Sequence, residues 1–296
     1  MTFNELRYLV TLSQTKHFGK AAALCHISQP TLSTAINKLE NELGVALFER
    51  HHHDIRITDV GEKIIMQAQR TLDELAKIEK IAEGDQSELN STLKIGGIFT
   101  LAPYLFPLLI PNLKKYAPNM PLIVQEDFTV NLRSKLQQGE LDAVFVALPF
   151  TEPLVVTKPI YDEPFMILMR NDNPLAKKKF IVNSDLKNQN VLLLGQGHCL
   201  RDQILEYCPD CANTSELQQI IEGSSLETIR HMVASGLGIT ILPNSATQVA
   251  HYSATLCARP FKDGSAKRTI ALAWRASFPR TKAIDALINA IDDCEF

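Results

Sequence analysis

The stretch FGKAAALCHISQPTLSTAINKLENELGVALFER, residues 18–50, decides the fold of the N-terminal part of the chain. It reads as a helix, a tight turn at HIS, and a second helix with Ser28 as its N-cap and Pro30 in its first turn. The small side chain of Ala22 would let the two helices approach closely. A turn of about three to four residues between two helices is typical of a helix-turn-helix. We therefore expect this motif, with an apolar core formed by Ala21, Cys25, Ile27, Leu32 and Ala35.

The outer face of the second helix carries short hydrogen-bonding side chains. Such groups suit base edges and phosphates in the major groove of double-stranded DNA, and the helix N-terminus attracts phosphate. From Leu6 to Leu39 the chain has no acidic residue, although its net charge is −3. A small helical bundle with a polar face would show the same pattern, so both interpretations stay open on the pattern alone. The candidate DNA-binding residues here are Ser28, Gln29, Pro30, Thr31, Ser33, Thr34, Asn37 and Lys38.

The elements around this motif predict the rest of the architecture. A helix precedes it, LFERHHHDIRIT reads as a two-stranded wing, and apolar residues from Ile64 to Ala82 repeat at spacings of four and three, as in a long helix that needs a partner helix. From Leu93 strands and helices alternate, and strands resume after the stretch PIYDEPF, residues 159–165. This alternation predicts two α/β lobes on a mostly parallel sheet. The expected domains are a head at 1–60, a linker and dimerisation helix at 61–84, a hinge at 85–92, lobe 1 at 93–162 and 267–296, and lobe 2 at 163–266.

The composition indicates a globular protein. Hydrophobic residues make up 45% of the 296 residues and charged residues 21%, unlike a disordered chain. No apolar run approaches the ~20 residues that span a bilayer, and the first residues lack the pattern of a signal peptide. We therefore expect a cytoplasmic protein with no membrane partner. In a reducing compartment its six cysteines should be mostly thiols, and any bonded pair should be redox-active.

The segment GQGHCLRDQILEYCPDC, residues 195–211, indicates thiol chemistry. A helix is expected to begin near Cys199, so the helix N-terminus, His198 and Arg201 would all stabilise its thiolate. A thiolate is the form that a peroxide oxidises to sulfenic acid. Cys208 lies nine residues further on. On one helix the two residues would be about 13 Å apart, whereas a disulfide tolerates about 7 Å between Cα atoms, so a bond between them would require the helix to unwind.

Cys211 leaves several possibilities open. With Cys208 it forms a C-x-x-C pair, which can form its own disulfide or bind zinc; it could also be an alternative resolving thiol, or a bystander. Zinc would need two more ligands, and nothing in the sequence fixes them. The wing-tip histidines His51–His53 also suggest a metal, but adjacent histidines rarely converge on one ion. We expect neither a metal nor another cofactor.

The segment of residues 18–50 resembles the winged helix-turn-helix of LysR-type regulators, with their pattern AA…SQPTLS…LE…LG..LF.R. The match continues through Thr58 and Gly61. The family usually has leucine where this chain has Cys25, which we expect to be a buried core thiol without a redox role. The resemblance implies an α/β protein with an N-terminal winged helix-turn-helix, a long linker helix and a two-lobed regulatory domain like that of periplasmic binding proteins. It also implies a homodimer that assembles to a homotetramer, a role for Arg50 at the DNA, and RNA polymerase as a partner.

The pattern GHCLRDQ…C is similar to that of the hydrogen peroxide-sensing members of this family. The resemblance implies that Cys199 is the peroxidatic thiol and Cys208 the resolving one. It further implies that the protein is a transcription activator of the oxidative-stress response. It also implies a peroxide pocket, with Arg275 facing it. A glutaredoxin- or thioredoxin-type reductant would suit a cytosolic disulfide. The expected pocket residues are Thr100, Thr129, His198, Arg201 and Asp202.

Three other functions compete with this interpretation. The first is a LysR-type regulator that senses a small metabolite between the lobes, in which Thr100 would bind a carboxylate. The second is an enzyme, either a thiol peroxidase or a cysteine hydrolase, but an enzyme would have no use for the winged head. The third is a periplasmic solute-binding protein, which the absent signal peptide and the DNA-binding head disfavour. We therefore expect a regulator and not an enzyme.

Overall fold

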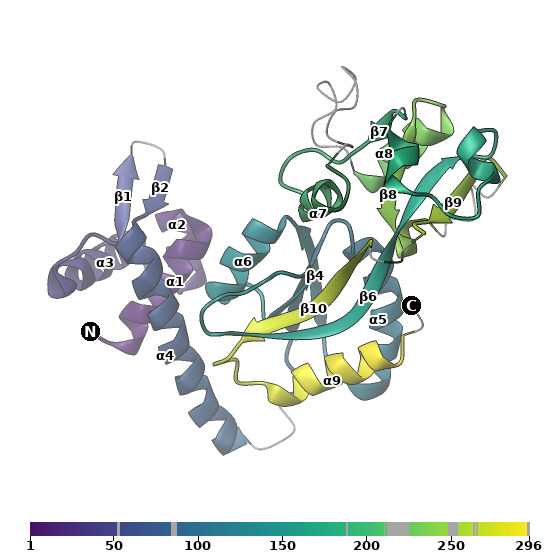
Figure 1. Ribbon diagram of the computed structural model, residues 1–296. Coiled ribbons are helices and arrows are strands. Elements are labelled where there is room, and N and C mark those ends of the chain that lie inside the picture. The colour runs from purple at the N-terminus through teal and green to yellow at the C-terminus, as the bar shows by residue number, and fades with distance from the viewer. Residues whose placement is uncertain are drawn as a thin grey trace.

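The computed structural model describes residues 1–51, 54–83, 88–187, 189–209, 211, 225–247, 254–262, 264 and 266–294. Three parts follow one another along the chain: a helical head, a long helix and a two-lobed α/β domain (Figure 1). Within the described residues, no helix is long and apolar enough to cross a membrane.

The head is the predicted winged helix-turn-helix. Ser28 caps its second motif helix by accepting a hydrogen bond from the Thr31 main-chain N–H at 3.3 Å, and Gly44 ends that helix in the left-handed region at φ 70°, which suits a residue without Cβ. The expected core residues Ala21 and Leu32 are fully buried, as predicted, and the core also contains Ile36. The elements are α1 (Phe3–Thr15), α2 (Phe18–Leu24), α3 (Gln29–Leu43), β1 (Phe48–His51) and β2 (Asp54–Ile57).

The expected burial of Cys25 is wrong, because Cys25 is the C-cap of α2 and is only half-buried. Ile27 and Ala35 are half-buried too. Cys25 and Ile27 lie in the turn between α2 and α3, outside both helices.

Helix α4 (Asp59–Glu83) begins two residues before the predicted start of the linker. The Thr58 hydroxyl accepts the Gly61 N–H at 2.9 Å and donates to the Ala46 carbonyl at 2.8 Å. A side chain at Gly61 would overlap the Leu47 carbonyl oxygen, so glycine is required for the head to pack on α4. The buried face of α4 contains Ile65 and Ala68.

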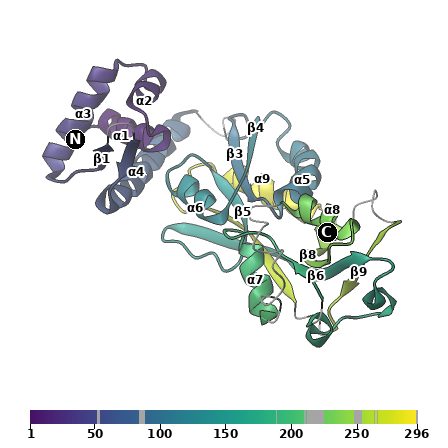
Figure 2. The same ribbon diagram turned by 90° about the horizontal axis from the view of Figure 1, so that it is seen from above.

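The regulatory domain contains one curled sheet in the order β4-β3-β5-β10-β6-β8-β7, with β9 also pairing with β6. On β3, Gly96 faces Leu132 of α6 and the adjacent Gly97 faces Ala102 of α5, so these two helices cover opposite faces of the sheet (Figure 2). The elements are β3 (Leu93–Ile98), α5 (Ala102–Tyr116), β4 (Leu122–Asp127), α6 (Thr129–Gln137), β5 (Ala143–Ala147), β6 (Val155–Arg170), β7 (Val191–Leu192), α7 (Cys199–Tyr207), α8 (Leu226–Ala234), β8 (Ile239–Pro243), β9 (Leu256–Pro260), β10 (Lys267–Arg275) and α9 (Thr281–Asp292), with short 3-10 turns η1 (Pro174–Lys177), η2 (Asn183–Leu186) and η5 (Asn244–Thr247).

The domain has two separate apolar cores, which define lobe 1 and lobe 2. The lobe 1 core is built from β3, α5, α6, β5, β10 and α9, and the lobe 2 core from the end of β6, β7, α7, α8, β8 and neighbouring turns. Strand β6 passes from one lobe to the other: its first part pairs with β10, and residues 165–170 pair with β8 and β9.

Two expectations about the sheet are wrong. The sheet is mixed and not mostly parallel, because β10 pairs antiparallel with β5 and β6, and β6 pairs antiparallel with β8 and β9. The stretch PIYDEPF, expected to separate two strands, lies inside the 16-residue strand β6. Pro159 lies beside a register shift in the pairing with β10, and Pro164 is the last residue of β6 that pairs with β10, so both prolines are at irregular positions of the ladder.

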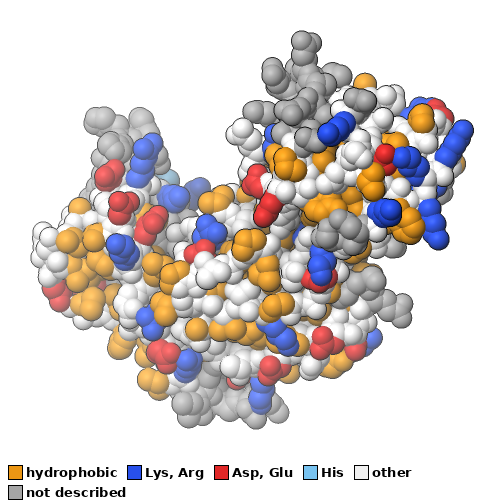
Figure 3. All heavy atoms as spheres, viewed as in Figure 1, with side chains coloured by type: hydrophobic (Ala, Val, Ile, Leu, Met, Phe, Trp, Pro, Cys, Tyr) orange, Lys and Arg blue, Asp and Glu red, His pale blue; other side chains and the backbone are white. Residues whose placement is uncertain are grey.

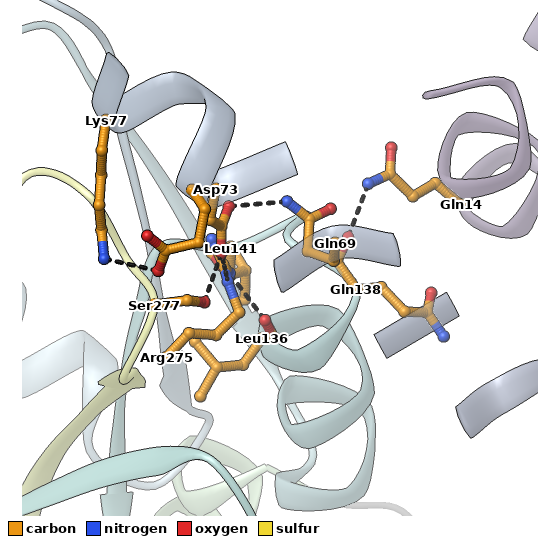
Figure 4. Close-up of polar contacts among 10 residues, drawn as sticks. Gln14, Gln69, Asp73, Lys77, Leu136, Gln138, Leu141, Arg275 and Ser277 are labelled. Atoms are coloured by element: carbon orange, nitrogen blue, oxygen red, sulfur yellow. Dashed lines mark hydrogen bonds and ion pairs between the residues drawn. The ribbon is translucent and has the colours of Figure 1, made fainter. Parts of the chain in front are cut away.

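Helix α4 is joined to lobe 1 by a buried ion pair (Figure 4). Asp73 Oδ2 accepts hydrogen bonds from Arg275 Nε at 3.1 Å and from Ser277 Oγ at 2.7 Å. Arg275 Nη1 donates to the carbonyl oxygens of Leu136 at 2.7 Å and Leu141 at 2.8 Å. The side chains of Asp73 and Arg275 are each 7% exposed, so each charge depends on the other for its compensation.

Further polar contacts continue this interface to the head. Gln69 Nε2 donates to Asp73 Oδ1 at 2.9 Å, and Gln14 Nε2 of α1 donates to the Gln138 carbonyl of lobe 1 at 2.9 Å (Figure 4). Beyond α4, Arg280 donates to the carbonyl oxygens of Glu88, Ser91 and Thr92 at 2.6–3.0 Å. The end of the predicted hinge is thus held on lobe 1, while residues 85–87 lie outside the described residues.

We expect Asp73→Ala to lower the free energy of unfolding by about 3–5 kcal/mol, because it leaves the Arg275 guanidinium buried without a counter-ion. The matched control is Lys77→Ala, which removes the exposed Lys77–Glu74 pair on the same helix and should cost less than about 1 kcal/mol. Urea unfolding followed by circular dichroism measures both. Equal midpoints for the two variants would contradict the importance of the buried pair.

A second ion pair predicts a pH dependence of the head. The hydrogen bond from Lys38 Nζ at 2.9 Å lowers the pKa of the Glu5 carboxyl. A carboxyl with a lowered folded pKa stabilises the fold above its unfolded pKa, and this contribution is lost as the pH falls through the folded pKa. Lys38→Met should therefore lower the melting temperature at pH 7 more than at pH 4. The control is Lys20→Met, an exposed lysine of α2; a pH-independent difference for Lys38→Met would argue against this coupling.

Candidate functional site

Helix α7 presents Cys199 as its first residue, as the sequence predicted. After β7 the chain turns at Gly197, whose φ of +92° favours glycine, and His198 is the N-cap. No side chain caps the helix at His198. Arg201 Nη1 donates to the Leu194 carbonyl at 2.8 Å, so its guanidinium is held beside the helix start. Asp202 lies in the first turn.

The two ends of α7 are buried in different lobes. Cys199 is partly buried against the lobe 1 core, whereas Cys208 is 1% exposed within the lobe 2 core. Gln203 Nε2 also reaches lobe 1, where it donates to the Leu148 carbonyl at 2.9 Å. Helix α7 therefore bridges the junction of the lobes.

The helix also sets the separation of Cys199 and Cys208. Cys208 follows the last helical residue, and its N–H donates to the Ile204 carbonyl at 2.8 Å. Nine residues of helix correspond to about 13 Å along the axis, beyond the ~7 Å between Cα atoms that a disulfide allows. Both residues are thiols here. A bond between them requires α7 to unwind.

A cavity of about 460 Å³ lies between the lobes in front of His198. The His198 ring stacks edge-on against Phe128, with ring centres 4.8 Å apart, and near Phe99 at 6.1 Å. Burial lowers the pKa of His198, which favours its uncharged imidazole, and a neutral imidazole can donate or accept a hydrogen bond. The stabilisation of a Cys199 thiolate by His198 stays a prediction.

The cavity includes Thr100, whose side chain is held by a buried arginine. Arg268 Nη1 donates to Thr100 Oγ1 at 2.9 Å, and Arg268 Nη2 donates to Glu163 Oε2 at 2.7 Å. A guanidinium only donates hydrogen bonds, so the Thr100 oxygen accepts and its own proton stays available to a ligand. Glu163 Oε1 accepts the Ser245 N–H of lobe 2 at 3.0 Å.

Arg268 is the functional residue that the sequence analysis missed. Arg275, which was expected at this pocket, is instead paired with Asp73 of α4. Both arginines are on β10, and the sequence does not say which of them meets a carboxylate of another strand. The only available signal was that Arg268 falls among the buried positions of an apolar strand, where a charge needs a partner.

The other expected pocket residues are distributed around α7 and α6. Thr129 is the first residue of α6, and its buried hydroxyl has no hydrogen-bond partner within the described part of the chain. Buried hydroxyls are usually satisfied, so this one can serve a small polar ligand. Of the five expected residues, Thr100 and His198 line the cavity, whereas Thr129, Arg201 and Asp202 do not.

The expected DNA-binding face is largely exposed. Gln29, Thr31, Thr34 and Asn37 are exposed on α3, whereas Ser33 is half-buried. Lys38 is exposed, but its ammonium group is paired with Glu5. Ser28 serves as the helix cap and Pro30 is exposed in the first turn. The side chain of Arg50, and His52 and His53, lie outside the described residues.

A metal site does not emerge from the part of the chain that the structure describes. Within it, no three His, Cys, Asp or Glu side chains gather as metal ligands would. Cys208 and Cys211 of the C-x-x-C pair lie at the opposite end of α7 from Cys199.

Comparisons with known proteins agree with this architecture. The family described as the bacterial regulatory helix-turn-helix protein, lysR family, matches residues 3–62, and the LysR substrate binding domain matches residues 86–294. The DNA-binding transcriptional dual regulator OxyR of Escherichia coli K12 is 35% identical over 98% of this chain and 95% of its own length. The hydrogen peroxide-inducible genes activator of Haemophilus influenzae is 36% identical over 99% of this chain and 97% of its own length.

Solved structures give the same result. A full-length OxyR variant from Pseudomonas aeruginosa is 51% identical, with a TM-score of 0.90 over 100% of this chain and 96% of that one. A hydrogen peroxide-bound OxyR mutant from Corynebacterium glutamicum is 34% identical, with a TM-score of 0.64 over 98% of this chain and 91% of that one. The chain therefore belongs to the LysR family of bacterial helix-turn-helix regulators, in which it groups with the OxyR proteins.

Proposed function

We propose that this chain is a DNA-binding transcription activator that hydrogen peroxide switches by forming a disulfide between Cys199 and Cys208. The observation that carries the proposal is the position of these thiols at the two ends of α7, with Cys199 packed against the lobe 1 core and Cys208 inside the lobe 2 core. A disulfide between them cannot leave the fold unchanged. The similarity to proteins named as hydrogen peroxide-inducible activators supports the choice of peroxide as the signal.

The proposed chemistry begins at Cys199. Its thiolate attacks one peroxide oxygen, giving a sulfenic acid and hydroxide, which takes up a proton to leave as water. Thr100 has a proton to donate to the peroxide, and Thr129 has an unpaired hydroxyl. We assign His198, Arg201 and Asp202 to positioning and proton transfer around the helix start. The Cys208 thiol then displaces water from the sulfenic acid and forms the disulfide.

The unwinding of α7 would carry the change to the rest of the molecule. It removes the Gln203–Leu148 hydrogen bond and the packing of Cys199 on lobe 1. The surfaces that other subunits contact would then be repacked. Helix α4 leaves Ile78 66% exposed, and apolar side chains also gather on the outer surface of the head (Figure 3). We assign these surfaces to the contacts of a homodimer that pairs into a homotetramer on DNA. In this proposal the assembly acts on RNA polymerase in the cytoplasm, and a glutaredoxin- or thioredoxin-type protein reduces the disulfide.

The size of the cavity favours a second candidate, a LysR-type regulator of a small metabolite. About 460 Å³ is far more than a peroxide needs and lies in the range of small-molecule sites. Phe99, Phe128 and Leu226 give this cavity a largely apolar lining. Such a regulator would respond to its ligand without any thiol.

The first test is a brief, near-stoichiometric peroxide pulse followed by trapping of thiols and mass spectrometry. We expect a linkage from Cys199 to Cys208 in the wild type, none in Cys199→Ser, and a normal linkage in Cys257→Ser. The last is a matched control, because burial raises the pKa of the Cys257 thiol and so disfavours its reactive form. If Cys199 stays reduced while other thiols react, the metabolite regulator becomes the better account.

The same pulse tests the pocket. Thr100→Val keeps the shape of the side chain but removes the proton donor, and we expect it to slow Cys199 oxidation by about 100-fold or more, as for loss of one proton-transfer group. Thr100→Ser keeps the hydroxyl and should oxidise at nearly the wild-type rate. Equal rates for Thr100→Val and the wild type would remove Thr100 from the mechanism.

A further prediction concerns the DNA. We expect Gln29→Ala on α3 to weaken binding to a specific site by about 1–3 kcal/mol relative to random DNA, because it removes contacts to a base edge. Gln67→Ala, on an exposed position of α4, is the control and should leave the ratio unchanged. Fluorescence anisotropy at fixed salt gives both affinities; an unchanged ratio for Gln29→Ala would place sequence recognition elsewhere.

A further inference from the structure

Cys208 has a second sulfur much closer than that of Cys199. The Cys211 thiol donates to Cys208 Sγ, with 2.6 Å between the two sulfur atoms, and the Cys211 N–H donates to the Cys208 carbonyl at 3.0 Å. Both side chains are 1% exposed in the lobe 2 core. The two residues are thus held together in a tight turn just beyond the end of α7.

Cys208 can therefore form two different disulfides, with opposite effects on the fold. A bond to Cys199 requires α7 to unwind, because the helix separates the two thiols. A bond to Cys211 joins sulfurs that are already in contact, in the turn after the helix, and leaves the nine residues of α7 in place. Of the two, only the Cys199–Cys208 disulfide therefore changes the junction of the lobes.

We propose that Cys211 ends the activated state by taking Cys208 away from Cys199, an inference that rests on the proposed function. The Cys211 thiolate attacks the Cys208 sulfur of the Cys199–Cys208 disulfide. The Cys208–Cys211 bond forms, the Cys199–Cys208 bond breaks, and Cys199 leaves as a thiolate; the proton from the Cys211 thiol goes to solvent or to Cys199. The exchange is redox-neutral, so it needs no further oxidant or reductant.

Two physical effects drive the exchange in this direction. Cys211 is three residues from Cys208 in the sequence, so it remains near Cys208 even when α7 is unwound, and its effective concentration is high. Release of Cys199 also lets α7 re-form and lets Cys199 pack again on lobe 1. The disulfide that remains is buried in the lobe 2 core, where Cys208 cannot resolve a second oxidation of Cys199. The chain would then return to its resting shape while still oxidised, and a reductant would be needed before it could respond again.

The sequence lets mass spectrometry distinguish these species. Trypsin places Cys199 in the peptide 188–201 and both Cys208 and Cys211 in the peptide 202–230. The Cys199–Cys208 disulfide links the two peptides, whereas the Cys208–Cys211 disulfide lies within one peptide, which is then two hydrogens lighter. Further cleavage before Asp210 separates Cys208 from Cys211 and identifies the partner in each linkage.

The experiment follows the full-length protein after one equivalent of peroxide, without reductant, in the wild type, Cys211→Ala and Cys211→Ser. In the wild type we expect the linked peptides to rise and then fall as the internal disulfide replaces them. In both variants the linked peptides should persist at least ten times longer. Two substitutions are used so that a folding defect in one of them, seen by circular dichroism, does not decide the result.

Each outcome has a definite meaning. A Cys199–Cys208 linkage that persists equally in the wild type and both variants overturns the exchange but keeps the peroxide switch. A linkage from Cys199 to Cys211 also overturns it, because Cys211 would then be the resolving thiol. Absence of any linkage to Cys199, even in the variants, means instead that the proposed function itself has failed.

A separate measurement tests the pair without peroxide. In Cys199→Ser, oxidised dithiothreitol should convert Cys208 and Cys211 to a disulfide with no loss of helical signal in circular dichroism. Failure to form this disulfide, or its formation only with loss of helix, would overturn the inference regardless of what peroxide does.

Discussion

The length of α7 is the constraint on which the rest of the molecule depends. Its first residue packs on the core of lobe 1 and its C-cap is buried in the core of lobe 2. Helical geometry fixes the distance between those two ends, and packing at both ends fixes where the helix lies. The segment can therefore occupy the helical arrangement or give up one of its anchors, with little room for intermediate positions. Such a two-state element is what a switch requires, because packed cores do not deform gradually.

The frame around α7 contains a buried ion pair close to the junction of the lobes. Strands β6 and β10 belong to the junction of both lobes, and the Arg268–Glu163 pair between them is almost fully buried. A buried ion pair offsets its desolvation only in a narrow geometry, and here Thr100 of lobe 1 and the Ser245 N–H of lobe 2 complete it. These contacts hold the lobes in one relation while α7 is folded. The same arginine orients the hydroxyl of Thr100, so the pocket and the junction of the lobes share one support.

The sequence predicted what depends on local pattern and failed where distant partners decide. The helix-turn-helix, the cap at Ser28 and the helix start at Cys199 follow from neighbouring residues, and the structure has all three. The extent of β6 could not be read, because PIYDEPF becomes a strand only through its pairing with β10. Arg275 and Arg268 lie seven positions apart on one strand. Only the fold shows that Arg275 pairs with Asp73 and Arg268 with Glu163. The contact between Cys208 and Cys211 was foreseen as a C-x-x-C pair, but the sequence did not show that both thiols are buried away from Cys199.

The route from α7 to the DNA-binding head is restricted by the contacts of α4. Asp73 and Arg275 fix α4 on lobe 1, Gln14 joins the head to the same lobe, and Arg280 holds the chain that follows the linker. Within one chain the head, α4 and lobe 1 therefore form a connected unit, and α7 lies at its far junction with lobe 2 (Figure 1). Within the described residues, these contacts leave no hinge close to the head through which a change in α7 could act. In the proposed homotetramer, it would reach the DNA by altering how lobe surfaces meet other copies of the chain, since their arrangement would set the spacing of the heads. The proposed switch is thus a property of the assembly, triggered by a bond within one subunit.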